Sequence, residues 1–203
     1  MKNTIIKKIR VSVLIALVLC IMISAVSFDA KCDDLRNNVL RLHILANSDS
    51  DADQELKLKV RDAILENSAI QFEECCNLAD ALKVAENSTA ELSLIAQKVI
   101  KENGYNYEVK VEVGKSYFDT REYENFTLPA GFYNSVIIKI GKAEGKNWWC
   151  VMFPALCVPS ANASLNESVG EDSAKIATNA SNYKIAFKSV EIYEKFKKIV
   201  LNK

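Results

Sequence analysis

The sequence has few of the residues that metal sites and enzymes most often use. It contains one histidine, His43, and no two of its six cysteines are separated by two residues. Both features argue against a zinc site, which needs several closely spaced cysteine or histidine ligands. The chain has only six glycines and contains no glycine-rich phosphate-binding loop. The sequence therefore gives no reason to expect a metal ion or another cofactor.

An excess of basic residues is also lacking. The chain has 26 lysines and arginines against 26 aspartates and glutamates, and four of the basic residues lie in residues 1–27, which contain no acid. Residues 28–203 are therefore mildly acidic, with 22 basic and 26 acidic residues. Because a nucleic-acid-binding domain needs a basic face, nucleic acid is not an expected partner.

Residues 1–27 are predicted to be a signal peptide or a membrane anchor. Basic residues precede an uncharged and mostly apolar run from Val11 to Ser27. This run is long for the core of a signal peptide and slightly short for a membrane-spanning helix. Ala25 and Ser27 are small residues at the spacing that a signal peptidase needs, so cleavage before Phe28 and retention as an anchor are both open. In either case the basic N-terminus places the rest of the chain outside the cytoplasm.

Export changes how the cysteines are interpreted, because disulfides form outside the reducing cytosol. Five cysteines follow the apolar run, so at least one of them is unpaired or bonded to a partner. Cys150 and Cys157 flank a short segment with a proline, and closing this loop is geometrically reasonable. We predict a disulfide between them, whereas the sequence does not define the roles of Cys32, Cys75 and Cys76.

The most informative stretch combines a predicted strand, a polar turn and a charged helix. Residues 39–45 form an apolar run that predicts a largely buried strand. Residues 47–50, here called the polar elbow, have side chains that bond to nearby backbone and favour turns and helix starts. Ser50 is a natural N-cap for a helix over about residues 51–67, with Asp53 three residues further on.

This helix has apolar residues on two sides. One side is the expected core stripe, and at ~100° per residue Leu58 and Leu65 project from the opposite side, beside Arg61. Asp53 and Lys57 are expected at the edge of the core stripe and, with Arg61, are expected to line one edge of an exposed helix. A second apolar strip is either covered by the protein's own loops or is a binding surface. The core stripe comprises Ala52, Leu56, Val60, Ala63 and Ile64, and the candidate partner-binding residues are Asn47, Ser48, Asp49, Asp53, Lys57, Leu58, Arg61 and Leu65.

After Gly104 the periodicity changes from helical to alternating. Residues 105–113 predict a half-exposed strand, and residues 136–140 and 147–153 predict two more, joined as an antiparallel hairpin. We therefore expect a single α+β domain over residues 28–203, with a small antiparallel or mixed sheet packed against several helices.

The end of the chain is predicted to be partly flexible. Residues 160–182 are rich in serine, asparagine and alanine and are typical of a flexible connection. Residues 183–187 are expected to form a short closing strand. A final helix follows, in which Ile192, Phe196 and Ile199 face one way.

Two long motifs resemble the stage II sporulation protein R family. The motifs are similar to those of the family in their residues and in their order along the chain: ANSDSDADQELKLKVRDAIL and YFDTREYENFTLPAGFYNSVIIKIGKAEGKNWWCVMFPALC. With the final helix, the resemblance covers roughly residues 39–195. It implies a non-enzymatic signal of endospore-forming bacteria, exported from the forespore toward the space between forespore and mother cell. There the family activates a membrane-embedded aspartic protease, which processes an inactive sigma factor of the mother cell.

Two other functions remain open from the residues alone. One is an exported hydrolase of the cell envelope that uses cysteine and histidine chemistry. His43, the only histidine of the chain, would have to supply the imidazole. The other is a structural protein of the envelope.

Overall fold

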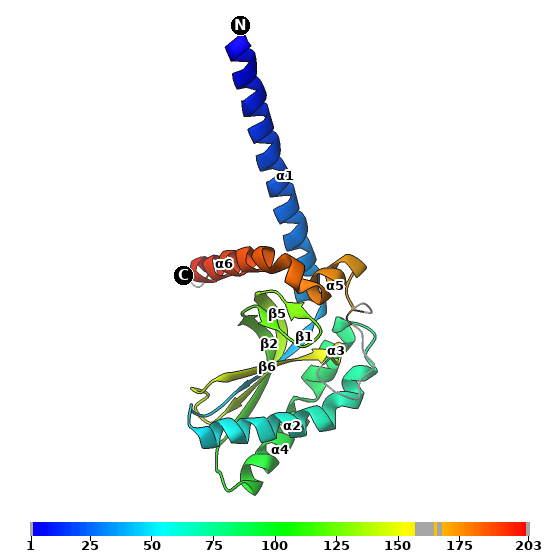
Figure 1. Ribbon diagram of the computed structural model, residues 1–203. Coiled ribbons are helices and arrows are strands. Elements are labelled where there is room, and N and C mark those ends of the chain that lie inside the picture. The colour runs from blue at the N-terminus through cyan, green and yellow to red at the C-terminus, as the bar shows by residue number, and fades with distance from the viewer. Residues whose placement is uncertain (1, 157–164, 166–167, 202–203) are drawn as a thin grey trace.

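A mixed four-stranded sheet with helices on both faces makes up the body of the protein (Figure 1). The computed structural model describes residues 2–156, 165 and 168–201. The strands lie in the order β2–β5–β1–β6, with β1 parallel to β5, and β2–β5 and β1–β6 antiparallel. This architecture confirms the expected α+β class. The elements are α1 (Lys2–Asn38), β1 (Leu40–Leu45), α2 (Asp51–Glu73), α3 (Leu78–Asn87), α4 (Thr89–Glu102), β2 (Val109–Phe118), β3 (Arg121–Glu122), β4 (Thr127–Leu128), β5 (Gly131–Ile140), β6 (Asn147–Phe153), α5 (Glu171–Thr178), the 3-10 helix η2 (Ala180–Tyr183) and α6 (Lys184–Leu201).

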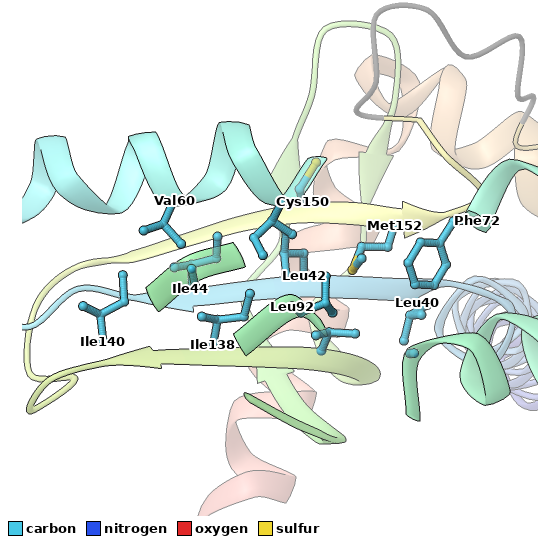
Figure 2. Close-up of a cluster of buried hydrophobic side chains, with 14 of the residues drawn as sticks. Leu40, Leu42, Ile44, Val60, Phe72, Leu92, Ile138, Ile140, Cys150 and Met152 are labelled. Carbon is cyan, nitrogen blue, oxygen red and sulfur yellow. The ribbon is translucent and has the colours of Figure 1, made fainter. Parts of the chain in front are cut away.

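One face of the sheet packs against α2, α3 and α4. The alternation of side chains along β1 directs Leu42 and Ile44 into this layer, where they are fully buried. Figure 2 shows Ile44 near Val60 of α2, in a cluster that also receives Ile138 of β5 and Cys150 of β6. The core stripe of α2 is confirmed at Leu56, Val60 and Ile64, whereas Ala52 is exposed and Ala63 is half-buried.

The opposite face is covered by the end of α1 together with α5 and α6 (Figure 1). Leu35 of α1 and Phe187 of α6 are buried there against Tyr133 of β5. A hydrogen bond joins α1 to the residue just before β5: Nε of Arg36 donates to the carbonyl oxygen of Ala130 at 2.9 Å. The two helical layers thus lie on opposite sides of one sheet.

Helix α1 is long and apolar enough to cross a membrane. Its large apolar side chains are exposed from Ile6 to Val26. Packing against the body begins at Phe28, whose ring lies 5.3 Å from that of Phe187. These features are consistent with a signal sequence or an anchor, and the division into residues 1–27 and 28–203 stays a prediction.

Three expectations from the sequence are wrong. Strands β5 and β6 do not form a hairpin, because β1 lies between them. Residues 184–187 begin α6 rather than form a strand. Residues 171–178 are not a flexible connection but the helix α5, in which Ala174, Ile176 and Ala177 are buried.

The predicted disulfide is not tested by this structure. Cys150 is a buried residue of β6, but Cys157 lies outside the described residues, as do residues 158–164 and 166–167. The bridge therefore stays a prediction.

Candidate functional site

The polar elbow (residues 47–50) is organised around one buried carboxylate. Asp53 accepts hydrogen bonds from Nδ2 of Asn47 at 2.9 Å and from Oγ of Ser48 at 2.5 Å. The backbone N–H of Asp53 donates to Oγ of Ser50 at 3.2 Å, which confirms Ser50 as the N-cap of α2. The chain direction between β1 and α2 is thereby fixed by side-chain hydrogen bonds.

These hydrogen bonds keep Asp53 ionised. Burial favours the neutral acid, but hydrogen bonds from Ser48, Asn47, Tyr107 and Ser50 outweigh it and lower the pKa of Asp53 below its ordinary value. Near neutral pH the carboxylate is therefore charged and holds the elbow through several donors.

The elbow is also bonded to the turn between β5 and β6. The backbone N–H of Lys142 donates to Oδ1 of Asn47 at 3.0 Å, and that of Lys146 donates to Oδ1 of Asp49 at 2.6 Å. Gly145 N–H donates to the carbonyl oxygen of Ala46 at 3.0 Å. Residues 46–53 and 141–146 thus form one hydrogen-bonded assembly, here called the elbow–turn unit.

Gly145 allows the close approach within this unit, which leads to a testable prediction. A Cβ atom at Gly145 would collide with the backbone carbonyl oxygen of Ser48. We expect Gly145→Ala to lower the free energy of unfolding by about 1–3 kcal/mol, as overpacking does elsewhere. Gly114→Ala is the control, since a Cβ there meets nothing within 4 Å. Thermal melts of the detergent-purified full chain check this, and equal midpoints for the two variants would contradict it.

Lys57 is also part of the buried structure. Its side chain is 4% exposed, and Nζ donates to Oε1 of Gln54 at 2.6 Å and to the carbonyl oxygen of Lys146 at 3.0 Å. Burial lowers the pKa of the Lys57 amine, and the cations Arg61 and Lys146 lower it further, whereas Asp49 raises it.

The expectation that Asp53 and Lys57 line an exposed helix edge is therefore wrong. Asp53 is only 5% exposed and Lys57 4%. The angular projection places both residues correctly at the margin of the core stripe. The turn at residues 141–146, however, folds over this margin and buries them. Both residues shape the elbow–turn unit.

The predicted second apolar strip of α2 is divided. Leu65 is half-buried and packs against the core cluster, whereas Leu58 is 37% exposed. Arg61, one helical turn from Leu58, holds its guanidinium 5.1 Å from the centroid of the Trp148 ring and pairs with Asp62 at 2.6 Å. We call the accessible area around these side chains the Leu58–Arg61–Trp148 surface.

Sequence reasoning did not identify Trp148 or the turn at residues 141–146 as parts of this site. Their signals were present. Gly141 and Gly145, four residues apart, mark a tight connection, and Trp148 is the second residue of the strand that follows. Nothing local, however, indicates that this connection lies beside residues about a hundred positions earlier.

His43 lies outside the elbow–turn unit. Its Nε2 and Oδ1 of Asn147 are 2.9 Å apart, and its ring contacts those of Phe118 and Trp149 at 5.7 and 6.1 Å. Burial lowers the pKa of His43, and the cations Arg41 and Lys139 lower it further, against the Asn147 contact, which raises it. Within the described part of the chain, the hydrogen-bond partner of the ring is an amide rather than a carboxylate that would orient a general base.

Comparison with known proteins identifies the family. Residues 36–163 match the family model of stage II sporulation protein R. The chain is 35% identical over 162 residues to stage II sporulation protein R of Bacillus subtilis (strain 168), an alignment that covers 80% of this chain and 71% of that protein. No solved structure matches. The matched region contains the elbow, the β5–β6 turn and Trp148, and the chain belongs to the stage II sporulation protein R family.

Proposed function

We propose that this protein is an exported sporulation signal that activates a membrane-embedded aspartic protease. In this proposal the chain leaves the forespore, and the protease lies in the mother-cell membrane and processes an inactive sigma factor. The protease contacts the Leu58–Arg61–Trp148 surface and the adjoining elbow. The observation that carries the proposal is a partly exposed surface of leucine, arginine and tryptophan side chains beside the hydrogen-bonded elbow–turn unit, within the region that matches the family.

The composition of this surface suits protein binding. Tryptophan and arginine are enriched among the residues that dominate interface energies, and leucine supplies apolar area. The stacking of Arg61 on Trp148 orders both side chains before contact. Because the elbow–turn unit is already hydrogen-bonded, little conformational entropy remains to be lost on binding.

Activation of this kind requires no catalytic group on the signal. A ligand shifts its partner from an inactive to an active state when it binds the active state more tightly. The surface therefore needs only to match the active conformation of the protease. An exported signal meets such a protease on the extracytoplasmic side, where the orientation predicted for α1 places the body.

Co-expression in a bacterium that does not sporulate tests the proposed function. The full chain, a candidate membrane-embedded aspartic protease and the precursor sigma factor are produced together and in each pairwise combination. Immunoblotting should detect the shortened sigma factor only when all three are present. A precursor that stays intact in the three-component strain, with all three proteins detected, would contradict the proposal.

His43→Ala separates a signal from an exported hydrolase. We expect the variant to activate precursor cleavage as the wild type does and to lose about 1–2 kcal/mol of stability, because removing a partly buried ring leaves a small cavity. Immunoblots for cleavage and thermal melts for folding provide the measurement. Loss of cleavage with a nearly unchanged melt would favour the hydrolase.

A structural envelope protein, by contrast, would be abundant and would not trigger cleavage.

A further inference from the structure

Helix α6 has an apolar face that points away from the body. Ile185, Ile192, Phe196 and Ile199 are between 63% and 85% exposed. At ~100° per residue they fall within an arc of roughly 60°. The opposite side of α6 packs on the body through Phe187, Val190 and Glu194, which are buried. No described residue covers the outward face.

Positive charge borders this face. The two glutamates of α6 are largely buried and paired: Glu191 with Lys188 at 3.2 Å and Lys195 at 2.7 Å, and Glu194 with Lys197 at 3.4 Å. Both acids thus face the body, whereas the lysine side chains are 45% exposed or more. A helix with an apolar side and a lysine-rich border is typical of segments that lie at a membrane surface.

The position of α6 relative to α1 indicates what the outward apolar face of α6 contacts. Phe28 of α1 contacts Phe187 of α6 and the ring of Tyr183 just before it, at 5.3 and 5.8 Å. The exposed apolar part of α1 ends at Val26, two residues before this contact. Figure 1 shows α6 running crosswise to α1 at the point where α1 reaches the sheet.

We propose that α6 lies in the headgroup region of the same bilayer that α1 enters, with Ile185, Ile192, Phe196 and Ile199 inserted among the lipids. A bilayer crossed by the apolar part of α1 has its surface near residue 27, level with the start of α6. The apolar face then enters the acyl boundary, and the bordering lysines attract anionic headgroups.

This inference extends beyond protease activation and does not depend on it. Two attachments, α1 and α6, fix the tilt of the body on the membrane. Helix α2 lies on the side of the sheet away from α6 (Figure 1). The Leu58–Arg61–Trp148 surface therefore points away from the chain's own membrane. If α1 is cleaved, α6 is the one of these two attachments that remains.

Photo-crosslinking to lipid tests the position of α6. The full chain carrying p-benzoylphenylalanine in place of Phe196 is reconstituted into vesicles of phosphatidylcholine and phosphatidylglycerol, without a protease, and irradiated. Leu94 of α4 is the matched control, since it is 72% exposed and lies in the other helical layer. Mass spectrometry should find at least about tenfold more lipid adduct at position 196 than at position 94.

A second variant separates insertion from proximity. Ile192→Asp and Ile199→Asp, added together, alter only exposed side chains and should leave the melt unchanged while reducing the lipid adduct at position 196 to the level at position 94. Equal adducts at positions 196 and 94 in the parent chain would overturn the proposal. Crosslinks between two copies of the chain at position 196, in place of lipid adducts, would overturn it as well.

Discussion

Leu58→Asp and Arg61→Glu, introduced together, should abolish activation of the protease while leaving the protein folded. Leu58 is 37% exposed and Arg61 is half-buried, and neither belongs to the buried core cluster, so the fold should tolerate both changes. In a contact surface, however, the new carboxylates remove apolar area and reverse a charge. Residues that dominate an interface each contribute about 2 kcal/mol or more. Cleavage of the precursor sigma factor should fall by at least about tenfold.

A matched pair on α4 controls for the chemistry of these substitutions. Leu94→Asp and Lys98→Glu likewise replace a leucine and a cation by acids, at exposed positions in the same helical layer. This control should activate cleavage normally, and thermal melts should show that both double variants are folded. Full activity of a folded Leu58→Asp, Arg61→Glu variant would mean that this part of α2 is not the interface.

Asp53→Ala should be the most destabilising change within the elbow–turn unit. The substitution removes the acceptor for Asn47 and Ser48 at a half-buried site. Nδ2 of Asn47 loses its carboxylate partner, and the Ser48 hydroxyl keeps only the longer contact to Oγ of Ser50 at 3.2 Å. Hydrogen bonds to a charged group are worth about 1.5–3 kcal/mol each, with strong coupling between them. We expect a loss of about 2–4 kcal/mol in the free energy of unfolding. Denaturant titrations measure it, with Asp51→Ala, an exposed acid in the same helical turn, as the control.

The effect of Asp53→Ala should depend on pH in a defined direction. Because the folded state lowers the pKa of Asp53, the carboxylate stabilises the fold above its unfolded pKa of about 4. This contribution is lost as the pH falls through the lower, folded pKa. The difference between wild type and Asp53→Ala should therefore be complete near neutral pH and shrink in acid. A difference that stays constant to low pH would show that the charge of Asp53 is not what holds the elbow.

The sequence predicted the features of this fold that depend on neighbouring residues. Strand β6 has the predicted bounds, Asn147 and Phe153. Ser50 caps α2 as expected, because its hydroxyl needs only the N–H three residues later. The core stripe of α2 follows from a repeat of 3.6 residues, which any amphipathic helix shows.

The features that the sequence did not predict depend on long-range pairing. Strand β1 enters the sheet between β5 and β6, and the short turn that joins those strands contains no sign of it. The same arrangement brings the β5–β6 turn over the elbow, which is why Asp53 and Lys57 are buried. At the chain's end, Ile185 and Phe187 alternate as in a strand, and so short a run cannot distinguish a strand from a helix.

The contact between the Leu58–Arg61–Trp148 surface and the protease can be measured most directly by photo-crosslinking in cells. The full chain carries p-benzoylphenylalanine at position 58, or at position 94 as the control, and is co-expressed with the protease and the precursor sigma factor. Irradiation should produce an adduct of the chain with the protease from position 58 and none from position 94. An adduct from position 94 alone, or none from position 58 while the precursor is being cleaved, would contradict binding through this surface.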